Sequence, residues 1–397
     1  MPELSERAKN YTASPVRKIA GMLEKSGFDK SIISFGGGSP SVPPPREVLE
    51  YACQKLAENP HLATTYGSTE GLPTVRELIA EDLRSTENLK VEADDIIITA
   101  GSTEGLFSAV FALVNPGDEV IFPDPGYFYG ETIKLAGAKP ARVPVNWKED
   151  FQILPQRLES AITKKTKAVI LTSPDNPTGA VQSKENVHAA IDICEDRDIW
   201  LITDEAYKDF VYREEYESPR HMSGSPNIVS CCSYSKSISI PGLRIGYAYG
   251  DREVINKLNQ VKQSTTLIAP RFAQFFVEKF LADHGKVKKK FVAEAREFYK
   301  SKMEVMSSAL NESGFEFSKP RGGFFFFLDL HDRLKTLRMD DETFCYRLME
   351  KEKLALVPGR FYGKNGEQHV RLTFVSETPE RIREGVKRLS SFINKHE

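Results

Sequence analysis

Short runs of β-branched and aromatic residues alternate with helical patterns through the middle of the chain. Strands are predicted at residues 96–99, 119–122, 168–172, 200–203, 228–230 and 245–249. Helices are predicted between several of them, most clearly at 103–114 and 184–196, where apolar side chains recur on one face. This alternation favours a mainly parallel sheet that is covered by helices on both faces.

The pattern changes after about Asp283. A long amphipathic helix is predicted at 291–310, with strands at 315–317, 324–328, 354–357 and 369–374, and helices near 342–351 and from Pro379. This order predicts a smaller α+β unit. We expect an N-terminal segment (1–45) packing with the small domain, a large domain (46–283) and a small C-terminal domain (284–397). The aromatic run 324–327 is predicted to be a core strand rather than a substrate pocket.

Composition narrows the class of protein. The 54 basic and 56 acidic side chains nearly cancel, so bulk charge indicates neither nucleic-acid nor membrane binding, and the run KVKKK (286–290) is interpreted as a solvated helix face. The five cysteines are odd in number and lack a C-x-x-C pair, which argues against a disulfide framework or a metal site. The polar N-terminus is no signal peptide, and the apolar runs are too short to span a bilayer. A cytoplasmic protein is expected.

Two loops at the predicted carboxyl ends of strands are suited to binding an anion. Ligands of parallel sheets bind at that edge. The loop AGSTEG (100–105) opens a helix, so backbone N–H groups and the hydroxyls of Ser102 and Thr103 can face a negative charge, although an ordinary helix cap explains it too. The loop SPDNPTG (173–179) presents Asn176 as a side-chain donor on a backbone stiffened by two prolines, although it can equally be only a rigid turn.

Two further loops carry ionisable groups. Asp204 follows the strand at 200–203, where a carboxylate can keep a ring nitrogen protonated, although a helix N-cap is the simpler explanation. Lys236 lies in SCCSYSKSISIPGLRIG (230–246), flanked by serines, with Arg244 eight residues further on. Isolated lysines are mostly surface charges. This stretch contains few other charges, and its lysine and arginine suit an aldehyde and a phosphate.

The order and spacing of these motifs resemble those of the fold-type I pyridoxal-phosphate enzymes, specifically the class I/II aminotransferases. The resemblance runs from about Ile33 to the C-terminus and is carried by S-x-S-K with its arginine, by N-P-T-G and by D-x-x-Y. It implies a mainly parallel seven-stranded sheet with helices on both faces plus a smaller α+β domain. It also implies pyridoxal phosphate as the cofactor. The implied reaction transfers an amino group from an L-amino acid to a 2-oxo acid by a ping-pong mechanism, with 2-oxoglutarate as the expected acceptor.

The resemblance also assigns cofactor residues. Lys236 would bind the cofactor covalently, Asp204 would pair with the ring nitrogen, and Tyr207 would hydrogen-bond the phenolic oxygen together with Asn176. These assignments make Lys236, Asp204 and Tyr207 the predicted catalytic residues. The remaining predicted cofactor contacts are Tyr127 over the ring and Ser102, Thr103, Ser233 and Arg244 at the phosphate.

Substrate and subunit contacts are implied in the same way. Arg371, in HVRLTF, matches the arginine that binds the substrate α-carboxylate, aided by Asn176 and by the backbone of Gly38. A planar guanidinium donates two parallel hydrogen bonds to a carboxylate. Tyr66 matches the tyrosine that reaches the active site of the neighbouring subunit, so a homodimer is expected.

Three alternatives stay open: a C–S β-lyase on the same fold, a transcription regulator and a scaffold without activity. The donor amino acid is also open between aspartate, aromatic, 2-aminoadipate-like and branched-chain types. The segment GGGSP (36–40) lacks the acidic residue that many relatives carry before the proline. A second arginine for a side-chain carboxylate has three candidates, Arg17, Arg321 and Arg360.

Overall fold

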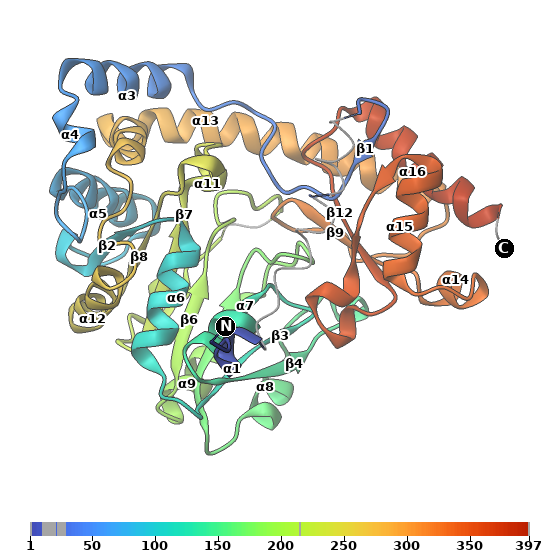
Figure 1. Cartoon of the computed structure of the whole chain (residues 1–397), viewed down its shortest axis with the longest axis horizontal. Helices are drawn as coiled ribbons and strands as arrows, with labels where there is room; N and C mark the ends of the chain where they lie inside the picture. Colours follow the sequence, from blue (N-terminus) through green and yellow to red (C-terminus); the bar gives the residue numbers. More distant parts are fainter. Residues whose placement is uncertain (1, 10–20, 22–28, 214–215, 396–397) are drawn as a thin grey trace.

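The computed structural model describes residues 2–9, 21, 29–213 and 216–395. A seven-stranded sheet in the order β2-β8-β7-β6-β5-β3-β4 forms the centre of the larger part (Figure 1). Its strands are β2 (Ile96–Thr99), β3 (Glu119–Asp124), β4 (Lys139–Pro144), β5 (Thr166–Thr172), β6 (Trp200–Asp204), β7 (Ile228–Ser233) and β8 (Gly246–Tyr249). Pairing is parallel from β7 to β4, and β8 runs antiparallel to both of its neighbours. The predicted mainly parallel sheet of seven strands is confirmed.

Helices cover both faces of this sheet because side chains alternate between the faces along each strand. In β5, Ala168 and Ile170 pack in one cluster with α6 and α7, whereas Val169 and Leu171 pack on the other face with α8 and α9. The helices of this part are α3 (Arg46–Glu58), α4 (His61–Thr64), α5 (Pro73–Glu87), α6 (Ser102–Leu113), α7 (Tyr129–Leu135), α8 (Pro155–Ala161), α9 (Lys184–Asp196), α10 (Pro219–Ser223), α11 (Tyr234–Ser237) and α12 (Arg252–Gln263).

The longest helix, α13 (Arg271–Glu312), links the two parts of the molecule (Figure 1). It packs against α3 and α5 at one end and against α16 (Pro379–Asn394) at the other. Its backbone leaves the helical region at Ala282 and takes positive φ from Asp283 to Gly285. The helical segment after this break contains the predicted helix at 291–310 and begins a few residues earlier, whereas the segment 271–281 before the break was not predicted. The missed segment is buried on several sides, so its apolar residues do not follow one helical face.

The smaller part holds two short sheets. One has the order β11-β12-β9 and the other pairs β1 with β10. Its elements are β1 (Ile33–Ser34), β9 (Phe325–Asp329), α14 (His331–Thr336), α15 (Asp341–Glu352), β10 (Leu354–Ala355), β11 (Val357–Pro358), β12 (His369–Thr373) and α16. Phe324, Phe325, Phe326 and Phe327 are all buried, which confirms the predicted core strand.

Three local predictions are corrected. No strand forms at 315–317; Phe315 instead lies in the core of the smaller part, and Phe317 packs against that core, edge-on to Phe326 with ring centroids 5.3 Å apart. Strand β4 was missed because it is an exposed edge strand with prolines at positions 140 and 144, which weaken a strand pattern. Within the basic run 286–290, Lys288 is buried and its Nζ lies 2.5 Å from Oδ2 of Asp82, because this side chain turns inward toward α5.

Among the described residues, no helix is long and apolar enough to cross a membrane.

Candidate active site

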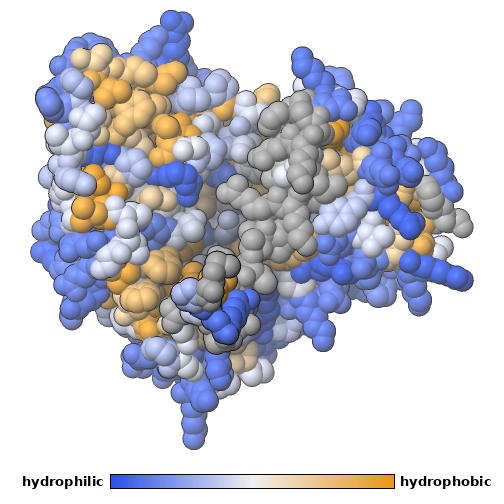
Figure 2. Space-filling view, viewed as in Figure 1, coloured by the Kyte–Doolittle hydropathy of each residue, from blue (hydrophilic) through white to orange (hydrophobic). Residues whose placement is uncertain are grey.

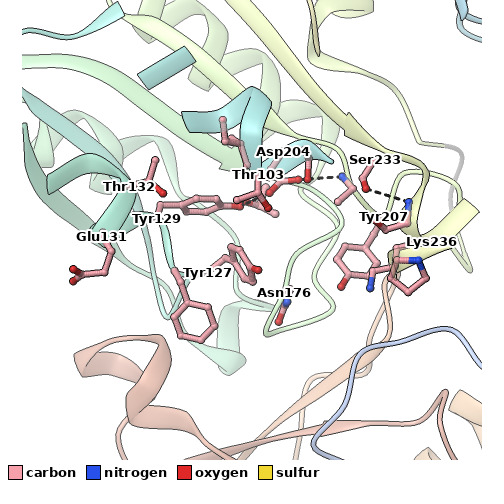
Figure 3. Close-up of a pocket in the computed structure, with 18 of the residues that line it drawn as sticks. Thr103, Tyr127, Tyr129, Glu131, Thr132, Asn176, Asp204, Tyr207, Ser233 and Lys236 are labelled. Carbon is pink, nitrogen blue, oxygen red and sulfur yellow. Dashed lines mark hydrogen bonds between the residues drawn. The ribbon is translucent and has the colours of Figure 1, made fainter. Parts of the chain in front are cut away.

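A cavity of about 520 Å³ opens at the carboxyl ends of the parallel strands, and Phe361 of the smaller part also lines it (Figure 3). All predicted cofactor residues except Tyr66 line it: Ser102, Thr103, Tyr127, Asn176, Asp204, Tyr207, Ser233, Lys236 and Arg244. They come from the ends of β2, β3, β5, β6 and β7 and from the turn before β8. Sheet topology therefore gathers residues that lie more than a hundred positions apart.

Asp204 is the last residue of β6 and is buried. Its Oδ1 accepts a hydrogen bond from the backbone N–H of Ala206 at 3.1 Å, and its Oδ2 accepts one from the Tyr129 hydroxyl at 2.8 Å. Burial raises the pKa of this carboxyl from its ordinary value of 3.8 to about 6, because the charged form loses hydration. The group is still mostly ionised at neutral pH, and an adjacent cation would stabilise that charge.

Tyr129 was not identified from the sequence. It opens α7, is 3% exposed, and extends toward Asp204 (Figure 3). Its hydroxyl lies 2.8 Å from Oγ1 of Thr172 as well as 2.8 Å from Asp204. Burial raises the pKa of Tyr129 well above its usual value, so the hydroxyl keeps its proton and can donate it. The motif PDPGYFY contains two tyrosines, and nothing in the spacing distinguishes the one that faces Asp204.

Lys236 lies in α11, directly after β7, and its Nζ points into the cavity beside Tyr207 (Figure 3). The ammonium donates a hydrogen bond to the Gly38 carbonyl at 2.7 Å. Burial and, to a lesser extent, the positive charges of Arg371 and Arg244 lower the pKa of Lys236 from 10.5 to about 8. In a substantial fraction of the molecules, Lys236 is therefore an uncharged amine near neutral pH, as a nucleophile or a base must be.

The N-terminus of α6 forms a cradle for an anion. Its N-cap is Gly101, with φ at +81°, and no side chain caps the helix. The positive φ favours glycine, and a Cβ at this position would lie 2.6 Å from Nη2 of Arg244, so a larger residue would displace the guanidinium. Arg244 is fixed there by donating to the carbonyls of Ala100 and Pro241. The open helix N-terminus, the arginine and the nearby serine and threonine hydroxyls suit a phosphate group.

Arg371 of β12 is 4% exposed and lies beside this cavity. It donates to Oδ1 of Asn176 at 3.1 Å and to the Gly36 carbonyl at 2.7 Å, and it stacks over the Phe325 ring. Its buried Nε has no hydrogen-bond partner among the described residues. A buried donor left unpaired is costly, so this guanidinium is suited to an acceptor that enters the cavity, such as a carboxylate.

These residues fit pyridoxal phosphate. A carboxylate, a lysine of lowered pKa, a phosphate cradle and an aromatic ring at Tyr127 share one cavity. The cradle is the most specific of these features, because it joins an open helix N-terminus to the Arg244 guanidinium.

Tyr66 lies outside this cavity. It is 82% exposed on the loop between α4 and α5. Gly38 lies next to the cavity, because its carbonyl accepts the hydrogen bond from Nζ of Lys236.

Two of the three arginines suggested for a second carboxylate lie elsewhere in the structure. Arg321 pairs with Asp150 at 3.0 Å and Arg360 with Asp341 at 2.7 Å, and neither lines the cavity. Arg17 falls outside the described residues. The cavity is lined instead by Arg142, whose strand β4 was not predicted.

Comparisons with known proteins agree with this geometry. The family model for aminotransferase class I and II matches residues 30–389. The aspartate aminotransferase of Pyrococcus horikoshii is 29% identical over 97% of this chain and 98% of its own length, and that of Sulfolobus acidocaldarius is 32% identical over 91% and 90%. Among solved structures, the aspartate aminotransferase from Thermus thermophilus with maleate superposes with a TM-score of 0.92 at 29% identity, covering 98% of this chain and 100% of that chain.

We expect covalent uptake of pyridoxal phosphate by the apoprotein to depend on pH through Lys236. Because its pKa is lowered to about 8, the uptake rate should rise about tenfold per pH unit well below that value and level off above it. The cofactor's absorbance follows the reaction, and Lys236→Ala should show no covalent uptake. A rate that keeps rising to the ordinary lysine pKa of 10.5 would contradict the assignment.

Proposed function

The chain belongs to the aminotransferase class I and II family, and from this membership we propose which of its residues carry the reaction and which substrates it takes. The protein is a pyridoxal-phosphate-dependent aminotransferase of fold type I, which moves an amino group from an amino acid to a 2-oxo acid in a ping-pong sequence. The predictions of family, fold, cofactor and reaction are confirmed. The residue roles, the substrates and the assembly are our proposals.

Bound pyridoxal phosphate supplies an electron sink for the pair left at Cα when its proton is removed. In our proposal, Asp204 holds the ring nitrogen protonated, because a carboxylate beside it stabilises the cationic ring. Asn176 and Tyr207 would hydrogen-bond the phenolic oxygen, and Tyr127 would face the ring, since all three line the cavity. The phosphate is held by Ser102, Thr103, Ser233 and Arg244.

We assign Lys236 two tasks. It holds the cofactor covalently at rest, and after the amino acid has taken its place it is a free amine inside the cavity. It then takes the proton from Cα and delivers it to C4′ of the cofactor. Both tasks need the uncharged amine, which its lowered pKa provides near neutral pH.

Arg371 is our assignment for the α-carboxylate of every substrate. The observation that supports it is the buried Nε, which has no hydrogen-bond partner in the described part of the chain, on a guanidinium already aligned by Asn176 and the Gly36 carbonyl. Alignment of the donors before binding reduces the entropy lost when the substrate binds.

For the second group of the substrate we propose a side-chain carboxylate bound by Arg142. This guanidinium lines the cavity, stacks over Phe122 at 4.5 Å and donates to the Tyr362 carbonyl at 2.7 Å. Arg371 lies over the ring of the same tyrosine at 5.4 Å, so two cations flank Tyr362. Oδ1 of Asp124 lies 3.5 Å from Nη1 of Arg142, which is too far for a strong hydrogen bond. Part of the positive charge of Arg142 is therefore left for a ligand.

Two arginines around one tyrosine suit a dicarboxylate, so we propose an acidic donor, aspartate, with 2-oxoglutarate as acceptor. The names of several relatives support this choice: those of Pyrococcus horikoshii, Sulfolobus acidocaldarius and Thermotoga maritima are called aspartate aminotransferases.

We propose that the protein is a homodimer in which Tyr66 completes the neighbouring active site. The loop that carries Tyr66 is fixed, because Arg271 donates to the carbonyls of Thr65 and Tyr66 and Lys262 donates to that of Thr69. Hydrophobic surface gathers on the side of the molecule that carries α3 and α4 (Figure 2). A rigid loop that presents an exposed tyrosine is suited to contact a second copy.

We further propose the division into an N-terminal segment (1–45), a large domain (46–283) and a small domain (284–397). The break in α13 at residues 282–285 and the pairing of β1 with β10 support it. We also propose that the enzyme works in the cytoplasm, where its five free cysteines would stay reduced.

The substrate proposal predicts a selective effect of Arg142→Met. The KM for aspartate and for 2-oxoglutarate should rise about tenfold or more, because a charge-assisted hydrogen bond is lost. The KM for monocarboxylic pairs such as alanine and pyruvate should change little. Arg321→Met is the matched control, since Arg321 pairs with Asp150 outside the cavity. Equal effects on acidic and neutral substrates would refute the role of Arg142.

The dimer proposal predicts complementation, at limiting pyridoxal phosphate, between a subunit of weakened cofactor affinity and an inactive subunit. Tyr66→Ala should weaken binding of pyridoxal phosphate about tenfold or more by removing a contact to its phosphate, and Lys236→Ala should be inactive. Refolding the two together creates mixed dimers, each with one site that has both residues intact. About a quarter of all sites are then complete in an equal mixture with random pairing. Activity no higher than the average of the two parents would rule out a shared site.

A further inference from the structure

We propose that Tyr129 is a positioning residue of the active site: its hydroxyl, held by Thr172, fixes the Asp204 carboxylate and keeps it ionised toward the cofactor's ring nitrogen. The inference rests on the proposed pairing of Asp204 with that nitrogen. It adds a residue that the sequence motifs of the family did not indicate.

The hydrogen bonds have a defined direction. The Tyr129 hydroxyl lies 2.8 Å from Oδ2 of Asp204 and 2.8 Å from Oγ1 of Thr172. An ionised carboxylate only accepts, so the single proton of Tyr129 is donated to Asp204. The tyrosine oxygen is then free to accept the proton of Thr172. The result is a chain of donors from Thr172 through Tyr129 to Asp204, in which each bond polarises the next.

Packing prevents the Tyr129 ring from turning away. It stands edge-on to Phe122, with centroids 5.9 Å apart and an interplanar angle of 88°. It also packs against Tyr127 at 5.5 Å and 63°. Because Tyr127 is the residue proposed to lie over the cofactor ring, Tyr129 contacts both the residue at the ring face and the residue at the ring nitrogen.

Asp204 needs such a donor because most of its surroundings oppose its charge. Burial disfavours ionisation, and the buried carboxyl groups of Glu205 and Asp175 lie nearby. The groups that favour the charge are the Ala206 N–H and the Tyr129 hydroxyl. Removing the hydroxyl raises the affinity of Asp204 for a proton, so the carboxylate then competes with the ring nitrogen for it.

The test compares Tyr129→Phe with the unaltered holoenzyme. A phenylalanine keeps the ring packing and removes only the hydroxyl. We expect the dissociation constant of pyridoxal phosphate, measured by titrating the apoenzyme, to rise about tenfold or more. The ¹⁵N resonance of labelled cofactor should move toward the value of an unprotonated ring, and kcat should fall with little change in the KM of the oxo acid.

Tyr212→Phe is the matched control. Tyr212 is also buried, and its hydroxyl donates to the Gly323 carbonyl at 2.7 Å and not to Asp204. This variant should lose stability without a ¹⁵N shift. If Tyr129→Phe also leaves the ¹⁵N resonance and cofactor affinity unchanged, the proposal is wrong.

Two more variants make the outcome decisive. Thr172→Val removes the donor to Tyr129 and should move the ¹⁵N resonance in the same direction by less. It replaces Tyr129→Phe as the deciding variant if that protein does not fold.

Asp204→Asn tests the premise that Asp204 pairs with the ring nitrogen. If Asp204→Asn does not move the resonance, the proposed pairing of Asp204 with the ring nitrogen fails. If Asp204→Asn moves it and the other two variants do not, only the role of Tyr129 fails.

Discussion

Burial of the Asp204 carboxylate at the end of β6 is the constraint on which the site depends. A charge taken out of water is costly unless donors and an opposite charge compensate it. Two donors, the Ala206 N–H and the Tyr129 hydroxyl, come from the protein. The opposite charge is supplied in our account by the protonated ring nitrogen of the cofactor. The free energy of burying Asp204 thus favours the cationic ring, which is the form that can withdraw electrons from Cα.

The same burial acts on Lys236 with the opposite sign. It raises the pKa of Asp204 from 3.8 to about 6 and lowers that of Lys236 from 10.5 to about 8. Each pKa moves toward neutrality because the charged form loses hydration. The lysine can therefore gain and lose a proton at little cost in free energy near neutral pH. One cavity thus provides both an anion for the ring nitrogen and a base for Cα.

The sequence allowed much of this site to be predicted, because its residues follow strands whose ends must meet at one edge of a parallel sheet. Loops after β2, β5, β6 and β7 supplied Ser102, Asn176, Asp204 and Lys236 in recognisable motifs. Tyr129 and Arg142 could not be predicted in this way. Their roles depend on packing between α7, the edge strand β4 and the smaller part of the molecule, which leaves no local pattern. The helical segment at 271–281 was missed for a related reason: burial on several sides removes the amphipathic period.

The most direct test of the account is the rate of the donor half-reaction in Asp204→Asn, measured in a single turnover with aspartate and no oxo acid. We predict that the variant still binds pyridoxal phosphate covalently at Lys236. Transfer of the amino group should slow by about a hundredfold or more, because the charge that holds the ring nitrogen protonated is gone. Transfer at the rate of the unaltered enzyme would contradict the central role of the buried carboxylate.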